Sequence, residues 1–424
     1  MRLVSSLSLA GLLIVSCHAA SAQEWTRFRG PNGSGESEAT TIPAQWTEKD
    51  INWKTSLPGI GHSSPVVWGD KIFLLSAEPD KGARPAMRYV LCVNANDGQI
   101  IWKREFQGVP HKLHNLSSYA SCTPAVDEKR IYFAWSDPEH TLLMAVDHSG
   151  NDLWTQDFGP WMSMHGLGTS PMLIDDLVVI TGSQEPSSKG PDSPRPKDSY
   201  VVAVDKENGQ IRWKTPRKID TASFSVPCIY KNADGKSELI CCSTAEGIFS
   251  LDPKTGKENW SEQVFKLRTV SSPILAGGLV IGTTGQGGGG GNAVVALRPG
   301  PKPEIVYEIA KVKAPYIPTP VAKGNLLFLW SDSGFVTCVK ADTGDELWSE
   351  RVGSKCYGSP VRVGDKLFCV EDDGKVYCLS ASEKFQRLGM YDLKEDSRTV
   401  PAIAGGKMYV RTLSNLYSIG GKKP

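Results

Sequence analysis

Residues 203–213 read Ala-Val-Asp-Lys-Glu-Asn-Gly-Gln-Ile-Arg-Trp, and variants of this stretch recur along the 424-residue chain. A small residue sits in an apolar run, a turn with Asp and Gly follows, and a large aromatic residue ends the motif. Glycine adopts positive φ at low cost, and an Asp side chain can bond downstream backbone amides. We therefore interpret the motif as two antiparallel strands joined by a tight turn.

Eight copies of the pattern align, each preceded by a proline that follows Ser, Thr or Val. The prolines are Pro65, Pro124, Pro171, Pro227, Pro273, Pro320, Pro360 and Pro401. The small residues are Cys92, Ala145, Ala203, Ser250, Ala296, Cys338, Cys378 and Ser418. The closing residues of the first seven copies are Trp102, Trp154, Trp213, Trp260, Tyr307, Trp348 and Leu388. A period of about 40 to 50 residues with short alternating strands indicates a β-propeller with one four-stranded blade per copy.

The eighth copy lacks a closing residue, because the chain ends six residues after Ser418. An unpartnered strand, 51–55, precedes the first copy and carries Trp53. Pairing this strand with the last copy would remove the open sheet edges. The sequence thus predicts an all-β, eight-bladed propeller of four-stranded antiparallel blades, closed by the N-terminal strand, as one domain over 51–424. The tryptophans would be wedges between blades, each indole N–H meeting a backbone carbonyl.

The N-terminus has the pattern of a secretory leader. Arg2 precedes an apolar run, and Ala20-Ser21-Ala22 fits a cleavage site, so residues 1–22 are predicted to be a signal peptide. Cleavage before Cys17, with lipidation of that residue, is the alternative. Residues 23–50 are expected to form an irregular lead-in across the propeller. No other stretch reaches the ~20 apolar residues of a membrane span, so the product is predicted to be exported to the periplasm or cell envelope.

Charge is nearly balanced, with 47 Lys plus Arg against 46 Asp plus Glu, which disfavours nucleic acid as a partner. We expect a monomer. Nine cysteines remain after cleavage at Ala22, an odd number. A two-residue turn at Asp373-Gly374 would place Cys369 opposite Cys378, and we predict a cross-strand disulfide between these two.

Propeller geometry places the connections between blades, and the loops between second and third strands, on one face. The insertions at 78–87, 107–118, 159–168, 184–198 and 285–291 all fall there. The residues just before the proline motifs should rim the channel and are the predicted ligand- or partner-binding set: His62, Tyr119, His165, Phe224, Arg268, Tyr316, Tyr357 and Arg398. Rings and guanidinium groups around a concave mouth suit a planar ligand, an acidic group or an extended peptide. His62 and His165 have no third ligand at fixed spacing, so no metal is predicted, and no catalytic residues can be assigned.

The repeat AxDxxxGxxxW resembles the tryptophan-docking repeat of the pyrroloquinoline quinone (PQQ)-like β-propeller family, over residues 51–420. The lead-in WxxFRGPxGxG at Trp25–Gly35 is similar to that of many bacterial members. The resemblance implies one of two roles. One branch comprises PQQ-dependent dehydrogenases with a calcium ion held by Glu, Asn and Asp. Another is the propeller lipoprotein of the outer-membrane β-barrel assembly machinery, which binds protein and has no cofactor.

The dehydrogenase pattern is incomplete in this sequence. No carboxylates have calcium-ligand spacing on the loop face. Some members of that branch carry a vicinal disulfide on the cofactor, but here Cys241-Cys242 lies inside a strand, where successive side chains point to opposite faces. We therefore predict an exported, non-catalytic module that binds a protein or glycan without a cofactor. The alternative is a PQQ- and calcium-dependent dehydrogenase.

Overall fold

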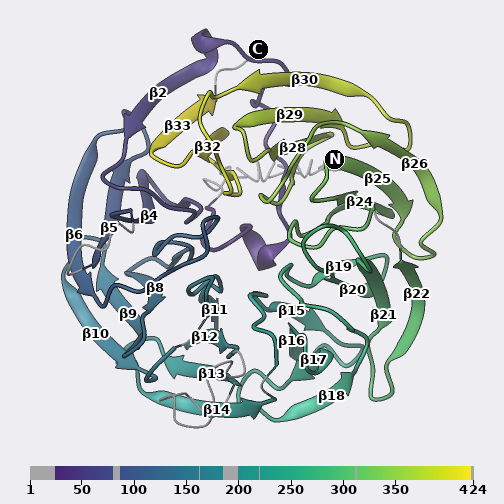
Figure 1. Cartoon of the computed structure of the whole chain (residues 1–424), viewed down its shortest axis with the longest axis horizontal. Helices are drawn as coiled ribbons and strands as arrows, with labels where there is room; N and C mark the ends of the chain where they lie inside the picture. Colours follow the sequence, from purple (N-terminus) through teal and green to yellow (C-terminus); the bar gives the residue numbers. More distant parts are fainter. Residues whose placement is uncertain are drawn as a thin grey trace, which may run out of the picture.

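The computed structural model describes residues 24–79, 86–161, 163–184, 199–218, 220–310 and 313–421. Eight four-stranded antiparallel sheets are arranged in a ring around a central channel, as predicted (Figure 1). Within the described residues the only helices are two 3-10 turns, η1 (Pro31–Gly33) and η2 (Glu48–Asp50). No helix in that part of the chain is both long enough and apolar enough to cross a membrane.

Each blade is named by its place in the chain, and its strands are given from the channel outward. Blade 1 contains β3 (Val66–Trp68), β4 (Lys71–Ala77), β5 (Ala86–Asn94) and β6 (Ile100–Gly108), and blade 2 contains β7 (Ala125–Val126), β8 (Arg130–Ser136), β9 (Thr141–Asp147) and β10 (Asp152–Asp157). Blade 3 contains β11 (Met172–Ile174), β12 (Leu177–Gly182), β13 (Ser199–Asp205) and β14 (Ile211–Arg217), and blade 4 contains β15 (Cys228–Lys231), β16 (Ser237–Ser243), β17 (Gly247–Leu251) and β18 (Glu258–Glu262).

Blade 5 contains β19 (Ile274–Ala276), β20 (Leu279–Thr284), β21 (Ala293–Arg298) and β22 (Glu304–Ala310), and blade 6 contains β23 (Val321–Lys323), β24 (Leu326–Trp330), β25 (Phe335–Lys340) and β26 (Glu346–Arg351). Blade 7 contains β27 (Val361–Val363), β28 (Lys366–Val370), β29 (Lys375–Ser380) and β30 (Arg387–Asp392), and blade 8 contains β31 (Ala402–Ala404), β32 (Lys407–Arg411), β33 (Asn415–Gly420) and β2 (Ile51–Ser56). The second and third strands are almost fully buried, and the outermost strands alternate between exposed and half-buried residues. The apolar core therefore lies between neighbouring blades.

The ring closes as the sequence predicts. Strand β2 pairs antiparallel with β33, and Trp53 lies opposite Ser418. The eighth blade is thus built from both ends of the described chain, and its outermost strand has the same partner register as those of the other blades. Without β2, the outer edge of β33 would be unpaired.

The recurring aromatic residues link each blade to the next. Five indole N–H groups donate to backbone carbonyls of the following blade at 2.9–3.2 Å: Trp53 to Ala95, Trp102 to His148, Trp154 to Lys206, Trp213 to Pro253 and Trp348 to Ser382. The Tyr307 hydroxyl does the same to Ala341 at 2.9 Å. Trp260 differs, because it donates to the Glu238 carboxylate in its own blade.

The turn glycine of the next blade lies against the docked ring. In the turn between β13 and β14, Gly209 has a φ of 72°, and an added Cβ would lie 2.5 Å from the Trp154 ring. The sequence suggested only the positive φ as the reason for this glycine. The structure adds a second reason, which is that only a residue without a side chain leaves room for the indole.

Blade 7 departs from the sequence alignment. Gly389, not Leu388, lies opposite Cys378, because the turn between β29 and β30 is one residue longer than the corresponding turn of blade 6. The lead-in fills the place of the missing aromatic residue, since the Ala44 carbonyl oxygen lies 2.3 Å from where a Cβ of Gly389 would be. Next to it Trp46 is buried and packs edge-on against Tyr391 at a ring distance of 5.5 Å.

The predicted pairing of Cys369 with Cys378 is wrong. Cys369 lies opposite Tyr377, and Cys378 lies opposite Phe368. The amide of Glu371 donates to the carbonyl of Lys375, so three residues rather than two form the turn. This shift of one residue places the two cysteines on opposite faces of the sheet, in separate core clusters.

The lead-in runs across the channel (Figure 1). It contacts Val67 and Gly69 at the turn between β3 and β4, so it lies at the end opposite the connections between blades. It begins on blades 1 and 2, where Trp25 bridges Val67 and the Thr26 carbonyl accepts the amide of Val126. Arg27 then donates to the Pro227 carbonyl of blade 4 at 2.7 Å. The chain next crosses to blade 7, where β1 (Glu36–Ser37) pairs parallel with β27.

Arg29 fastens the far end of this crossing. Its guanidinium is fully buried and donates to the carbonyls of Pro320 and Pro360, both at 2.8 Å, in blades 6 and 7. Two more of its hydrogen bonds, to Gly33 and Ser34, fix the lead-in itself. Burial lowers the pKa of Arg29 to about 9. The crossing closes this end of the channel. Phe28 faces the inside of the channel, toward the end that has the connections between blades.

A belt of hydroxyl groups explains the Ser or Thr before most of the repeat prolines. The amide at this position in one blade donates to the hydroxyl at the same position in the next blade, at 2.9–3.0 Å. The six links are Ser64 to Thr123, Thr123 to Ser170, Val226 to Ser272, Ser272 to Thr319, Thr319 to Ser359 and Val400 to Ser64. The belt is interrupted only where the next blade has valine, at Val226 and Val400, because valine has no acceptor.

Candidate functional site

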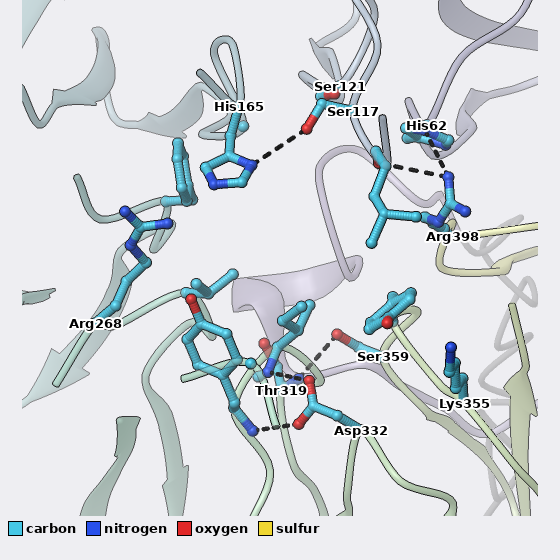
Figure 2. Close-up of a pocket in the computed structure, with 18 of the residues that line it drawn as sticks. His62, Ser117, Ser121, His165, Arg268, Thr319, Asp332, Lys355, Ser359 and Arg398 are labelled. Atoms are coloured by element: carbon cyan, nitrogen blue, oxygen red, sulfur yellow. Dashed lines mark hydrogen bonds between the residues drawn. The ribbon is translucent and has the colours of Figure 1, made fainter. Parts of the chain in front are cut away.

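A cup of about 640 Å³ opens at the mouth of the channel. Phe28 of the lead-in lines it, and hydroxyl groups of the belt, such as Ser64 and Thr319, form its lower wall. The upper wall comes from connections between blades and from two loops between second and third strands, those of blades 5 and 6. Figure 2 shows these side chains arranged around an open centre.

Seven of the eight predicted rim residues line this one cup: His62, His165, Phe224, Arg268, Tyr316, Tyr357 and Arg398. They come together because each directly precedes the first strand of a blade, and all eight first strands surround the channel. Tyr119 lies behind the wall instead. Its hydroxyl accepts the amide of His111 at 3.0 Å, so it supports the connection between β6 and β7. The role of the seven in binding remains a prediction.

One side of the cup is built from histidine and aromatic rings. His165 lies 5.0 Å from His114 and 6.0 Å from Phe224, measured between ring centroids. Burial, together with the nearby Arg268 and His114, lowers the pKa of His165 to about 4. His165 is therefore neutral at physiological pH.

Ser117 and His165 are placed like a nucleophile and its base, but their surroundings do not support that chemistry. The Ser117 hydroxyl lies 3.4 Å from Nδ1 of His165 (Figure 2). A catalytic histidine needs a carboxylate that stabilises its protonated form. Here the charged neighbour is Arg268, which has the opposite effect on the pKa. The pair is a poor proton acceptor near neutral pH.

The opposite side is organised by Arg398. Its guanidinium lies 3.4 Å from Nε2 of His62 and forms a 2.7 Å ion pair with Asp372. It also lies over the Tyr357 ring at 5.9 Å. Burial, with Arg398 and Arg411 beside it, lowers the pKa of His62 to about 3. His62 is therefore neutral, and among the described residues its Nδ1 has no hydrogen-bond partner.

Asp332 is the one carboxylate among the described residues that line the cup. It lies in the loop between β24 and β25, and its two oxygens accept the amides of Tyr316 at 2.7 Å and Ile317 at 3.1 Å. Burial raises the pKa of Asp332 to about 6 despite these hydrogen bonds. Its charge is therefore lost a little below neutral pH.

Basic side chains outnumber acidic ones around the cup. Among the described lining residues, Arg268, Lys355 and Arg398 are basic and Asp332 is acidic. Asp372, which does not line the cup, already forms the ion pair with Arg398. The exposed Lys355 is at the rim, in the connection between β26 and β27. The loop between β20 and β21 adds Gln286 and three glycines, 287–289, to the wall. The cup thus offers positive charge, apolar rings and backbone groups to a ligand.

Sequence reasoning missed His114, Asp332 and Lys355 as wall residues. Asp332 belongs to a short loop, Ser331–Gly334, on the face that was correctly predicted, but only the long insertions there were considered. The predicted topology alone indicates that Asp332 lies at the cup, because every loop between second and third strands lies on the cup face. The insertion at 184–198 lies almost entirely outside the described residues, as does much of 78–87.

The described residues do not fit a calcium-bound PQQ. Calcium prefers six to eight oxygen ligands, whereas the cup holds one carboxylate whose oxygens already accept amides. No group of three or more His, Cys, Asp or Glu in the described part of the chain is placed to hold a metal ion. Cys241 and Cys242 of β16 lie in separate core clusters, not at the cup.

Comparison with known proteins identifies the family. A family model described as outer membrane protein assembly factor BamB matches residues 46–299 and 308–412. Among curated relatives, tetrathionate hydrolase of Acidithiobacillus ferrooxidans is 24% identical over 54% of this chain. BamB of Legionella pneumophila is 25% identical over 40%. The chain covers only 42% and 39% of these two proteins' lengths.

Solved structures agree in fold. BamB from Moraxella catarrhalis superposes with a TM-score of 0.60 at 12% identity, over 87% of this chain and 99% of that one. Quinohemoprotein alcohol dehydrogenase from Comamonas testosteroni gives 0.67 at 13%, over 95% and 81%. These identities show a shared architecture and nothing more. The match of the family model over most of the chain shows that this protein belongs to the PQQ-like propeller family of outer membrane protein assembly factor BamB.

Proposed function

We propose that this protein is an exported, non-catalytic binding propeller that holds an acidic, extended segment of a protein partner in its cup. The observation that carries the proposal is the cup itself: an open cavity, closed below by Phe28 and walled by rings and by Arg268, Lys355 and Arg398. Membership of a family named for an assembly factor supports a binding role in the cell envelope.

Charge favours an acidic ligand over a basic or neutral one. Among the described residues, the three cations of the wall outnumber the wall carboxylate Asp332 and the ion-pair partner of Arg398, Asp372. Both histidines with low pKa values are neutral at pH 7. Carboxylates on an extended chain could form charge-assisted hydrogen bonds to the guanidinium groups. The apolar rings of Phe224 and Tyr357 would contact the stems between those carboxylates. A glycan without acidic groups would use only part of this chemistry.

A PQQ-dependent dehydrogenase remains the alternative function. The donor set of the cup argues against it, because Asp332 accepts two amides and the wall residues that the structure describes include no second carboxylate. Addition of PQQ and calcium to the purified protein, followed by dye reduction with alcohols, tests the alternative directly. We expect no turnover, and sustained dye reduction would overturn the non-catalytic role.

The binding proposal is tested with a fluorescent oligoglutamate peptide and fluorescence anisotropy at low salt. We expect Arg268→Ala and Arg398→Ala each to weaken binding about tenfold, the effect of losing one charged hydrogen bond of ~1.5 kcal/mol. Lys257→Ala is the matched control, because Lys257 is an exposed cation in the turn between β17 and β18, on the other face. An oligoglutamine peptide of equal length should not bind.

If Lys257→Ala weakened binding equally, the affinity for the peptide would depend only on the net charge of the protein. The cup would then not be the binding site. Equal affinity for oligoglutamine would exclude an acidic ligand. Retention of full affinity in both arginine variants would place the partner elsewhere on the molecule.

A further inference from the structure

Two cysteine side chains of blade 7 meet in the core beside the cup. Cys356 belongs to the connection between β26 and β27, and Cys369 lies on β28. Both are fully buried, and their sulfur atoms are 2.9 Å apart. All nine cysteines after the leader lie in the described residues, and this is the only sulfur–sulfur contact recorded among them.

The surroundings hold the two sulfurs against one another. The Gly358 carbonyl oxygen lies 3.2 Å from Sγ of Cys356 and 3.6 Å from Sγ of Cys369. Both side chains belong to the same apolar cluster between blades 6 and 7. The connection that carries Cys356 is fixed on either side, by the amide of Cys356 on the Asp332 carbonyl and the amide of Asp372 on the Lys355 carbonyl. The backbone on both sides of Cys356 is therefore held in place beside Cys369.

We propose that Cys356 and Cys369 form an intramolecular disulfide when the chain is exported. The predicted leader sends the protein to a compartment where disulfides persist. The pair replaces the predicted link from Cys369 to Cys378, whose side chains lie on opposite faces of the sheet. This modification is independent of the proposed binding function.

The oxidation needs a partner disulfide, which we assign to an exported dithiol oxidase. The thiolate of one cysteine attacks the oxidase disulfide, and one oxidase thiolate leaves. The second cysteine thiolate then displaces the oxidase from the mixed disulfide. The two cysteines lose two protons and two electrons, and the oxidase becomes a dithiol. Burial raises the pKa of Cys356 well above that of a free thiol, so the exchange belongs to folding, before blade 7 closes.

The disulfide would fasten one wall of the cup. The connection from β26 to β27 carries Lys355 and Tyr357, which flank Cys356 and line the cup. A bond to β28 would close a short loop, from residue 356 to residue 369, and tie this wall to the blade interior. A closed loop of this length lowers the entropy of the unfolded chain, and we expect it to raise Tm by about 4 °C.

Peptide mapping tests the bond in the full-length chain produced with its leader. Free thiols are alkylated under denaturing, non-reducing conditions before digestion with trypsin. Cleavage after Lys355, Arg362, Lys366, Lys375 and Lys384 places each cysteine in its own peptide: 356–362 for Cys356, 367–375 for Cys369 and 376–384 for Cys378. We expect 356–362 joined to 367–375, and separation of the two by dithiothreitol. Alkylation of both Cys356 and Cys369, or a link from 367–375 to 376–384, would overturn the proposal.

Thermal melts provide a second readout. Dithiothreitol should lower the Tm of wild type and of Cys378→Ser by the same amount, and should not change that of Cys356→Ser/Cys369→Ser. Cys378→Ser is the matched control, because it removes a buried cysteine from the same hairpin. If the double variant does not fold, the peptide map of the wild type still decides. If dithiothreitol frees both thiols of the wild type and its Tm does not change, the disulfide does not stabilise the protein.

Discussion

The contact between a turn glycine and a docked indole is the smallest unit that links two blades. At Gly209 the backbone φ of 72° and the Trp154 ring both exclude a side chain. Gly235 has a nearly identical φ of 75° with nothing within 4 Å of an added Cβ. The two positions therefore separate the cost of backbone strain from the cost of the steric clash.

We predict that Gly209→Ala lowers the free energy of unfolding by about 2 kcal/mol more than Gly235→Ala, because only the first change pushes the ring away. Urea denaturation followed by tryptophan fluorescence measures the difference. Equal losses in the two variants would mean that the ring contact adds nothing to stability.

His62 makes stability depend on pH. Its pKa is about 3 in the fold against 6.5 for a free side chain, so the folded state stays neutral where the unfolded chain takes up a proton. Stability from this group is present above pH 6.5 and is lost as pH falls toward 3. At pH 5 the expected loss relative to pH 7 is about 2 kcal/mol.

The change His62→Asn removes this titration. The difference in unfolding free energy between wild type and His62→Asn should shift by that amount between pH 7 and pH 5, in favour of the variant at pH 5. The comparison cancels the other titrating groups, including Asp332, whose raised pKa gives the opposite slope between pH 6 and pH 4. A pH-independent difference would mean that His62 is solvated in the folded protein.

Among structural elements, the hydroxyl belt joins the starts of six pairs of neighbouring first strands. Val226 and Val400 interrupt it. We predict that Val226→Thr raises stability by about 1 kcal/mol, since its hydroxyl would accept the Ser170 amide of blade 3. Thr319→Val, which removes the acceptor of the Ser272 amide, should lower stability by about 1–3 kcal/mol.

Val178→Thr is the control for this pair, because Val178 is fully buried in β12, away from the belt. It should destabilise the protein, as a hydroxyl in an apolar core does. Thermal melts of the three variants show whether each substitution raises or lowers Tm. If Val226→Thr behaved like Val178→Thr, the belt would not contribute to stability.

At the level of elements, the repeat made most of the fold predictable, because each blade has the same pattern of proline, small residue and aromatic residue. The errors fall where one residue changes a register. An extra turn residue between β28 and β29 moved Cys369 away from Cys378, and an extra turn residue between β29 and β30 put Gly389 in the aromatic register. Periodicity cannot distinguish a two-residue turn from a three-residue turn when both contain Asp and Gly.

The candidate site was predictable in part for the same reason. The proline motif placed seven wall residues, since position in the repeat fixes position around the channel. Asp332, His114 and the glycines at 287–289 lie outside the aligned motif, so the alignment did not place them. For Asp332 and the glycines, only the topology of the blade indicates the cup face. The role of Trp46 in blade 7 also depends on a contact between residues more than 300 positions apart.

At the scale of the whole molecule, the charge of the cup changes just below neutral pH. Asp332 loses its charge as pH falls through about 6, while the neutral histidines stay neutral until pH 4 or lower. An acidic ligand should therefore bind about fivefold more tightly at pH 5 than at pH 7.5, equivalent to ~1 kcal/mol for removing one nearby negative charge.

Anisotropy titrations of the oligoglutamate peptide at the two pH values measure this change, with Asp332→Asn as the comparison. The variant keeps an acceptor for the Tyr316 amide but cannot ionise, so its affinity should not vary in this range. Weaker binding of wild type at pH 5 than at pH 7.5 would contradict the charge assignment of the cup.

The path of the lead-in also gives the molecule a direction. Glu24 accepts the amide of Gly69 in the tight turn between β3 and β4, at the end of the ring away from the cup. The described chain thus begins at the end of the ring away from the cup, which we call the base, and the cup opens at the other end. A tether joined upstream of Glu24, such as a lipid on Cys17, would hold the base toward the membrane and present the open mouth to the surrounding compartment.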